Sequence, residues 1–514
     1  MSDRPYLLNI LGLSIVPRVV TSVMTMVSLP LMLRAVGATE FGLIVYVGAI
    51  IAVLESFVDG GVSSAAGKAV AVARETRQGS LRAEIMGWVR LQATVAAVGL
   101  LPLLGLSYLA ASTAPRIGLS VTLLFLLVLA AWLTIALNFV RAVLRSLLAF
   151  STVAVLDTLE SIFRSGAWIL VAWLMPSALG LAIGGLATAT CLSTLGPILL
   201  WQLLRKADAN RQSGEHTDAV APVSSTRSML RDSLEFLFLR VATRMFQAVP
   251  LVVFGRTFGT EVVGVVGAMA KLNEIVSFPF VIIGNALAVR APGIVANGLV
   301  ATGALWDAVS RFGAGALLLT MTVYFASESV TRLLLPDSQN AVPLVAILSF
   351  TLLTTSAAAL IVPMSDYVGA LRRRNLLMVC CAVGQVPVIW LGAKLGAKGA
   401  TAAYVLVLVF MTSGYLRIAL KAFFQEAAYH VPSEVRYFAR VLALACVVAA
   451  VGGRWLLPDR VFLTPSLDVT VLSVSLLWIT VLAGVMLDGR ARGFFISRQF
   501  LTFTPKPSLG LPPR

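Results

Sequence analysis

The chain has 514 residues, of which 58% are apolar and only 12% are charged. A soluble protein of this length needs more polar residues to cover its surface, and the composition also excludes a disordered chain and a disulfide-linked secreted scaffold. The net charge of +16 would suit a nucleic-acid-binding protein only with a basic, aromatic-containing soluble segment. Since the sequence has no such segment, we expect no nucleic-acid partner and predict an all-α polytopic membrane protein.

Apolar runs of about 20 residues predict the membrane spans. The fourteen predicted spans are 11–33, 41–62, 86–111, 117–140, 153–175, 178–204, 234–255, 262–289, 304–326, 341–364, 374–393, 398–420, 437–456 and 466–487. The first run is too long for a signal-peptide core, and no small-residue cleavage site follows it. We therefore expect it to remain as a membrane helix.

Polar segments divide these spans into domains. Residues 1–204 are predicted to form a six-helix bundle, and a flexible cytoplasmic linker follows at 205–233. A second six-helix bundle is predicted over 234–420. Residues 421–514 then supply an interfacial segment, two additional helices and a cytoplasmic tail.

The distribution of basic residues predicts the orientation. With both termini in the cytoplasm, the cytoplasmic segments hold 25 Lys and Arg residues and the opposite segments hold 8. Basic residues are enriched on the cytoplasmic side of membrane proteins, so both termini are predicted to be cytoplasmic.

An internal repeat relates the two bundles in a single ungapped register, which aligns Arg18 with Arg240 and Gly42 with Gly264. Eight of the 25 positions from Arg18 to Gly42 are identical in this register. Because the repeat unit contains an even number of predicted helices, both halves enter the membrane in the same sense. This predicts a parallel repeat around a central cavity, as in many transporters; a duplication kept for packing alone is the alternative.

Three arginines lie inside predicted spans, where an ionisable side chain is costly. Arg18 lies about 10 Å into the first span at 1.5 Å per residue, and Arg240 is its repeat equivalent. Arg244 follows Arg240 by one helical turn on the same face. These residues are predicted to line a cationic cavity that binds an anionic head group. Snorkelling of the side chains to the interface is the alternative.

Three carboxylates are candidates for coupling transport to a proton or cation. Glu160 is spaced to pair with Arg164, and Glu274 with Lys271. Asp59 precedes two glycines, a pattern typical of a helix end. Structural ion pairs and a helix terminus are the alternatives, and the residue types do not choose among them.

No metal or cofactor site is expected. The four cysteines lie in apolar stretches without a CxxC pair, and the two histidines lie far apart; they are Cys191, Cys380, Cys381, Cys446, His216 and His430. The sequence has no phosphate-binding loop of the G-x-x-x-x-G-K-[ST] type, so it is not expected to hydrolyse ATP. No catalytic residues are expected.

The stretch from Leu33 to Leu43, LRAVGATEFGL, and the Asp59-Gly60-Gly61 helix end resemble the N-terminal signature of oligosaccharide flippases. These form the polysaccharide transporter family of the multidrug/oligosaccharidyl-lipid/polysaccharide flippase superfamily. The resemblance is close only over the N-terminal part of the chain, from the first predicted span to the helix end. The repeat extends it over the two bundles.

The resemblance implies alternating access in the bacterial inner membrane. The implied substrate is an undecaprenyl-diphosphate-linked oligosaccharide, moved to the outer leaflet for O-antigen or exopolysaccharide assembly. The implied partners are this lipid, membrane lipids, and a polysaccharide polymerase and glycosyltransferases. The alternatives are a drug/cation antiporter and a lipid-linked peptidoglycan precursor flippase, both of the same superfamily. A membrane glycosyltransferase or polymerase fits less well, because the predicted outer loops are short.

Overall fold

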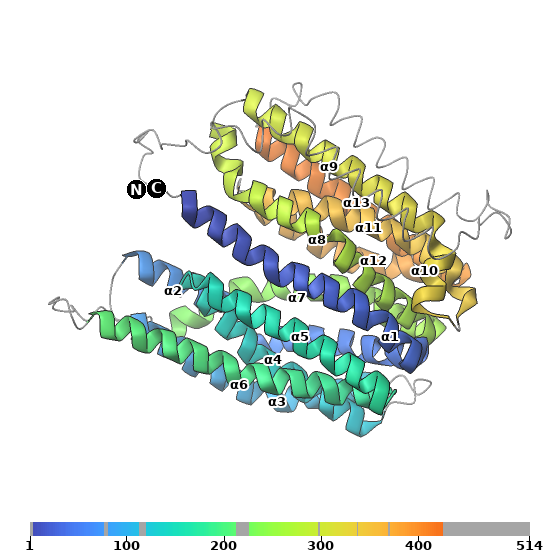
Figure 1. Ribbon diagram of the computed structural model, residues 1–514, viewed down its shortest axis with the longest axis horizontal. Coiled ribbons are helices and arrows are strands. Elements are labelled where there is room, and N and C mark those ends of the chain that lie inside the picture. Colours follow the sequence, from blue (N-terminus) through green and yellow to red (C-terminus); the bar gives the residue numbers. More distant parts are fainter. Residues whose placement is uncertain are drawn as a thin grey trace.

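The computed structural model describes residues 4–76, 81–112, 120–211, 226–296, 299–336, 338–367 and 371–424. Within these ranges the chain is helical apart from short turns and contains no strand, as predicted. Figure 1 shows the helices, which are α1 (Arg4–Asp59), α2 (Val62–Thr76), α3 (Leu81–Ser112), α4 (Val121–Ser146), α5 (Phe150–Leu174), α6 (Ala178–Arg211), α7 (Thr226–Phe258), α8 (Thr260–Ala296), α9 (Leu299–Phe325), α10 (Ser327–Leu334), η2 (Gln339–Ala341), α11 (Val342–Tyr367), α12 (Leu371–Ala393) and α13 (Gly396–Phe424).

The chain is a multi-pass membrane protein: in the described ranges, nine helices are long and apolar enough to cross a membrane. The first twelve predicted spans all fall on helices, two of them on α1. α5 coincides with a predicted span but is not among the nine; it carries three charged side chains close together, Asp157, Glu160 and Arg164. The predicted spans 437–456 and 466–487 lie outside the described residues, so the total of fourteen stays a prediction.

The first two predicted spans meet at a bend and not at a loop. α1 continues from one to the other through Gly37, whose φ of 84° lies in the left-handed region. Glycine adopts this conformation without the steric cost that a Cβ adds. The glycine of the Leu33–Leu43 motif therefore sets the angle between the two segments of α1.

A short helix follows α1 that the hydropathy pattern does not predict. α1 ends at Asp59, as the sequence predicts, and Gly60 and Gly61 have positive φ angles of 61° and 75°. α2 then begins at Val62. It has 15 residues with alternating polar and apolar faces, which is too short and too polar for a predicted span.

The predicted linker at 205–233 is too wide at both ends. α6 continues to Arg211 and α7 begins at Thr226, so residues 205–211 and 226–233 are helical. Polar residues predominate at these ends of both helices, so the helices are longer than the apolar segments that hydropathy detects. Residues 212–225 lie outside the described ranges.

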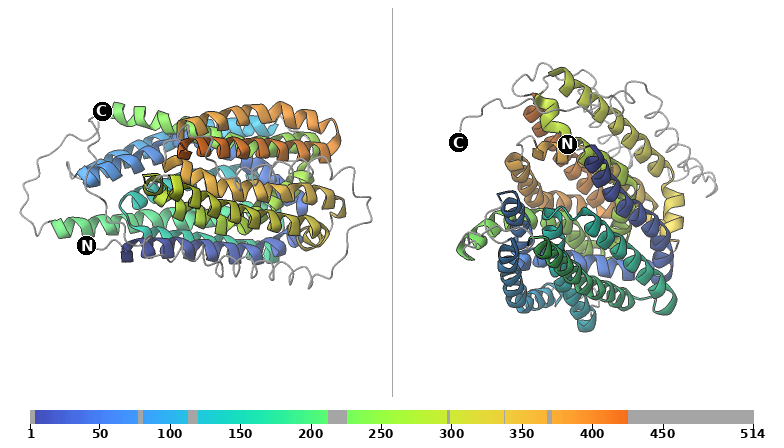
Figure 2. Two further views of the ribbon diagram at one scale, coloured as in Figure 1. Left: turned by 90° about the horizontal axis from the view of Figure 1, so that it is seen from above. Right: turned by 60° about the vertical axis from the view of Figure 1, so that its left-hand side comes forward.

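The two halves of the chain repeat the same helix order and packing. α4 and α5 begin at Val121 and Phe150, and α11 and α12 begin at Val342 and Leu371 with the same spacing between them. α4 packs against α6 as α11 packs against α13, and α5 packs against α1 as α12 packs against α7. We refer to α1–α6 as the first bundle and to α7–α13 as the second; Figures 1 and 2 show how their helices are arranged.

The bundles touch at a crossing of two repeat-related glycines. A Cβ on Gly42 would lie 1.8 Å from the Thr260 carbonyl oxygen, and a Cβ on Gly264 would lie 2.0 Å from the Ala38 carbonyl oxygen. Thr260 is the repeat equivalent of Ala38, as Gly264 is of Gly42. The two contacts are therefore related by the approximate twofold symmetry of the repeat, and each requires a residue without a side chain.

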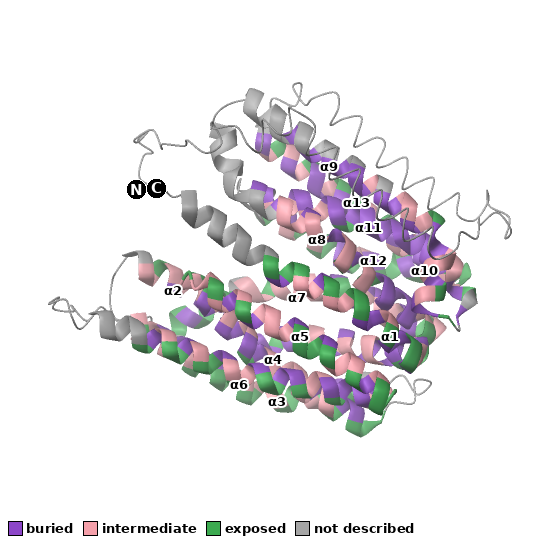
Figure 3. Cartoon of the chain, viewed as in Figure 1, coloured by how far each residue is buried: buried purple, intermediate pink, exposed green. Residues whose placement is uncertain are grey.

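Large apolar side chains cover the periphery. Leu101 of α3 is 76% exposed, and Trp173 of α5 is 87% exposed. Figure 3 shows further exposed residues along α3 and α6. A water-facing surface of this kind would be unfavourable, so these faces are suited to contact lipid.

Candidate functional site

A polar cavity of about 700 Å³ is formed by helices of both bundles. Its walls come from α1, α2, α4 and α5 of the first bundle and from α7 and α8 of the second. Most of the lining residues are polar or charged, although 58% of the chain is apolar. Such a concentration of polar groups among largely apolar helices provides a hydrophilic chamber between the bundles.

Basic side chains predominate in this cavity. Seven cationic residues of the described chain line it, namely Arg18, Arg141, Arg145, Arg164, Arg240, Arg244 and Lys271. The lining carboxylates of the same ranges are Asp157, Glu160 and Glu274. The structure thus brings all three sequence-predicted arginines, and two of the three predicted coupling carboxylates, to one cavity.

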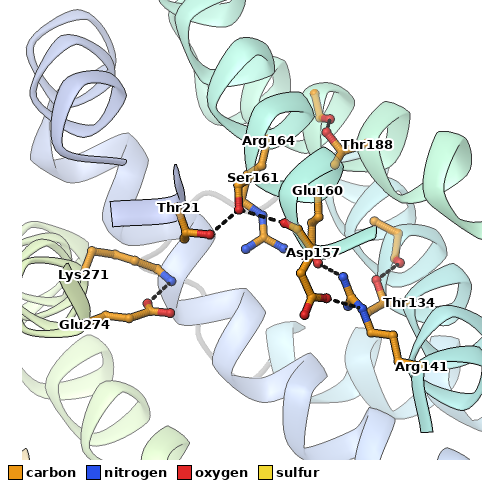
Figure 4. A network of polar contacts seen from close by, with 12 residues as sticks. Thr21, Thr134, Arg141, Asp157, Glu160, Ser161, Arg164, Thr188, Lys271 and Glu274 are labelled. Carbon is orange, nitrogen blue, oxygen red and sulfur yellow. Dashed lines mark hydrogen bonds and ion pairs between the residues drawn. The ribbon is translucent and has the colours of Figure 1, made fainter. Parts of the chain in front are cut away.

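An ion-pair network covers the wall formed by α4 and α5 (Figure 4). Arg141 Nε lies 2.9 Å from Asp157 Oδ1, and the Arg141 guanidinium also contacts Glu160. Glu160 in turn pairs with Arg164, as the i,i+4 spacing predicts. Arg145 Nη2 lies 3.9 Å from Asp157 Oδ2. The cations of this wall are therefore largely neutralised by its own carboxylates.

Arg141 and Arg145 were not predicted as cavity residues, because they follow a predicted span that ends at residue 140, whereas α4 continues to Ser146. The chain then turns at Leu148, which has a positive φ of 57°, and returns as α5. The two arginines are spaced i,i+4 and are followed by a helix that carries two carboxylates. This pattern could have predicted that the arginines pair with these carboxylates.

Arg240 connects the two bundles. Its Nη1 atom donates a hydrogen bond of 2.6 Å to Asp59 Oδ2, and its Nη2 atom lies 3.8 Å from Glu55 Oε1. The Asp59 side chain is fully buried and also accepts a 2.5 Å hydrogen bond from the Ser63 hydroxyl. Asp59 is therefore both the predicted helix end and the partner of Arg240. Its link to the cavity runs through Arg240 and Ser63, which both line it.

The Glu274 carboxylate lies on the α8 side of the cavity. It accepts a 2.8 Å hydrogen bond from Lys271 Nζ, the pairing that the i,i+3 spacing predicts. The Glu274 side chain is 65% exposed. Figure 4 shows this pair on one side of Thr21 and the α5 network on the other.

Arg18 and Arg244 differ from the other cavity arginines. Neither has an ion-pair or hydrogen-bond partner among the described residues, although both line the cavity. With Glu55 and Asp59 included, five carboxylates face the seven cations, so the described cavity has an excess of two positive charges. The arrangement is suited to bind an anion with about two negative charges through charge-assisted hydrogen bonds.

Metal ligation has no support in the described part of the chain. These ranges contain no group of three or more His, Cys, Asp or Glu side chains that could hold a metal ion. Cys191, Cys380 and Cys381 are free thiols. Cys446, His216 and His430 lie outside the described residues.

The fold is similar to those of solved membrane transporters. A structure titled lipid II flippase MurJ, inward closed conformation, superposes with a TM-score of 0.59 at 10% identity, covering 94% of this chain and 99% of that one. An inward-facing multidrug resistance MATE family transporter gives 0.57 at 13% identity, covering 83% and 97%. At these identities the likeness concerns the fold. No curated protein matches the sequence.

A match to a protein-family model covers the N-terminal half of the chain and the beginning of the second half. Residues 9–292 match the family model described as polysaccharide biosynthesis protein. This range includes the Gly37 bend, the Asp59 helix end and all charged residues that line the cavity. The chain therefore belongs to the polysaccharide biosynthesis protein family, within the multidrug/oligosaccharidyl-lipid/polysaccharide flippase superfamily.

Proposed function

We propose that this protein is a flippase that moves a polyprenyl-diphosphate-linked oligosaccharide from the cytoplasmic to the outer leaflet. A sugar head group cannot cross the hydrocarbon region unaided, because its hydroxyls would lose their hydrogen bonds to water. The polar cavity between two repeat-related bundles offers a hydrophilic path for the head group. Its lipid tail stays in the bilayer.

The observation that carries this proposal is the pair of cavity arginines that form no ion pair, Arg18 and Arg244. A diphosphate esterified at both ends has two negative charges near neutral pH, which equals the charge excess of the described cavity. Guanidinium groups bind phosphate oxygens through two parallel hydrogen bonds. Arg240, already paired with Asp59, contributes mainly by joining the bundles.

The charge of the cavity argues against a cationic drug as substrate. Seven cationic side chains of the described ranges line the cavity and would repel such a substrate. The lipid-linked peptidoglycan precursor is a second candidate, since it too would present a diphosphate. The solved structure of similar fold named for lipid II makes it a useful comparison substrate.

We place the protein in the bacterial inner membrane with both termini in the cytoplasm, acting on undecaprenyl-diphosphate-linked units for O-antigen or exopolysaccharide assembly. Glycosyltransferases would supply the substrate and a polymerase would consume the product. Of the coupling candidates, Glu274 is the most exposed to the cavity, whereas Asp59 and Glu160 are each held by arginine. We therefore assign ion coupling to Glu274, and Glu274→Gln should lower transport and abolish its dependence on the driving ion.

The test is a flipping assay with purified protein in liposomes that contain a fluorescent undecaprenyl-diphosphate-linked sugar. Arg244→Gln and Arg18→Gln should each reduce the initial rate by about 10- to 100-fold, since a charge-assisted hydrogen bond contributes about 1.5–3 kcal/mol. Lys at either position should restore part of the rate, because it keeps the charge but loses the planar geometry. Wild-type rates for both Gln variants would remove these arginines from the substrate path.

A further inference from the structure

A second pocket of about 320 Å³ adjoins the cavity. Its walls come from α8, α11 and α13 of the second bundle, with Arg18 contributed by α1. Arg18, Glu274 and Phe278 line both the cavity and this side pocket. Arg18 therefore stands where the two spaces meet.

The internal repeat explains why this space is open. Arg18 is the repeat equivalent of Arg240, and in the same register the equivalents of Glu55 and Asp59 are Ser277 and Val281. Ser277 and Val281 both line the side pocket together with Arg18. In one half an arginine is bound by two carboxylates; in the other half the carboxylates are replaced by a hydroxyl and an isopropyl group, and the arginine forms no ion pair.

The side pocket contains hydroxyl groups that lack protein partners. Among the described residues, no hydrogen bond is made by the hydroxyls of Ser277, Thr355 or Tyr404, which come from α8, α11 and α13. By contrast, Asn273 donates its amide N–H to Thr351 and so ties α8 to α11. Three hydroxyls thus converge on one small space from three helices.

A sugar ring is the ligand class that this lining matches. None of the three hydroxyls is a buried group without a partner, and Thr355 is exposed, so all three are available to exchange hydrogen bonds with a ligand in the pocket. The aromatic rings of Phe278 and Tyr404 supply apolar surface against the C–H groups of such a ring.

We infer that the side pocket binds the sugar attached directly to the diphosphate, while Arg18 at its mouth binds the diphosphate itself. The inference rests on the proposed function and adds the place of the carbohydrate within the site. If it is correct, removing a pocket hydroxyl weakens the binding of ligands that carry a sugar and leaves the binding of sugar-free ligands unchanged.

The test compares two kinds of soluble probe on the full-length protein in detergent. The first is farnesyl diphosphate with a methyl ester on its terminal phosphate, which gives it the same charge as the sugar-linked probes and is the form meant by farnesyl diphosphate below. The second is farnesyl diphosphate linked to N-acetylglucosamine, glucose or galactose. Wild-type protein should bind at least one sugar-linked probe more tightly than farnesyl diphosphate. Tyr404→Phe and Thr355→Val should each weaken that preferred probe about fivefold, the value of one hydrogen bond, and leave farnesyl diphosphate unchanged. Unchanged binding of farnesyl diphosphate also shows that the variants are folded.

Tyr324→Phe is the matched control, because it removes a tyrosine hydroxyl from α9 in an aromatic contact with Phe350 outside the pocket. It should change neither affinity. Equal binding of all probes by wild-type protein, or full affinity of both pocket variants for the preferred probe, would overturn the sugar assignment and leave the flippase proposal standing. Failure of wild-type protein to bind any probe would overturn both.

Discussion

Arg18 and Arg240 occupy equivalent positions in the two halves of the chain, yet their surroundings differ. Arg240 is held by the buried Asp59 and by Glu55, whereas Arg18 forms no ion pair among the described residues. The same repeat therefore supplies one arginine that joins the bundles and one that is available to a ligand. The two halves share the scaffold and differ at two positions, where Glu55 and Asp59 correspond to Ser277 and Val281.

The repeat-related helices α5 and α12 also differ in their charges. Asp157, Glu160 and Arg164 of α5 correspond, when the starts of α5 and α12 are aligned, to Met378, Cys381 and Gln385. Gln385 is buried and donates to backbone carbonyls of α7, including the Phe246 oxygen at 3.2 Å. A charged helix that lines the cavity in the first half thus corresponds to a neutral helix in the second half, none of whose described residues lines the cavity.

The largest effect is expected from removing the partner of Arg240. Asp59→Ala leaves a mostly buried guanidinium with only the distant Glu55, and loss of one partner of a buried ion pair costs about 3–5 kcal/mol. Thermal unfolding in detergent should show the loss, together with lower abundance in membranes. Glu328→Ala is the matched control, because its partner Arg332 is 62% exposed and the pair should contribute at most about 1 kcal/mol. Equal stability of the two variants would contradict the structural role of Asp59.

The next largest effect is expected when a residue of the second half is replaced by its equivalent in the first half. Ser277→Glu places a carboxylate at the position equivalent to Glu55, where it should pair with Arg18 and compete with the diphosphate. Affinity for farnesyl diphosphate should fall about 10- to 100-fold, from the loss of a charge-assisted hydrogen bond. Ser277→Gln has the same size without the charge and should bind farnesyl diphosphate nearly as wild type does. A similar loss in both variants would show that bulk, and not charge, is responsible.

A smaller loss of stability, similar in the two halves, is expected at the crossing of Gly42 and Gly264. Gly42→Ala and Gly264→Ala each drive a methyl group into the backbone of the other bundle and should destabilise the protein by about 1–3 kcal/mol. The two losses should be similar, because the contacts are related by the repeat. Gly48→Ala, on the same helix as Gly42 with no atom within 4 Å of the added Cβ, should not destabilise the protein. Unequal losses at 42 and 264 would show that the crossing is not symmetrical.

The smallest effect is expected in the charged wall. Arg164 is 49% exposed, and its partner Glu160 keeps a second cation, Arg141, so Arg164→Gln should change the free energy of unfolding by no more than about 1 kcal/mol. Arg141 is 11% exposed and contacts both Asp157 and Glu160. Arg141→Gln should therefore cost clearly more in the same unfolding measurement. The reverse order would show that the exposed end of the network carries its stability.

Much of the fold was predictable because it depends on local properties of the chain. Hydropathy predicted twelve apolar segments that all fall on described helices, nine of which are long and apolar enough to cross a membrane. The helix end at Asp59 and the pairs Glu160–Arg164 and Lys271–Glu274 follow from spacing within a few residues. The two predicted spans 11–33 and 41–62 correspond to the two helical segments of α1 that meet at Gly37.

By itself, the sequence determined the class of protein, the internal repeat, and the arginines placed within the membrane. Only the tertiary structure decided which of those arginines is free of an ion pair: Arg240 meets Asp59 from a distant part of the chain, and Arg141 meets Asp157 across the turn between α4 and α5. Such partners depend on the rotation and packing of separate helices, which hydropathy and spacing do not specify. The sequence shows that a predicted span contains a charged residue, but only the tertiary structure shows which residue neutralises it.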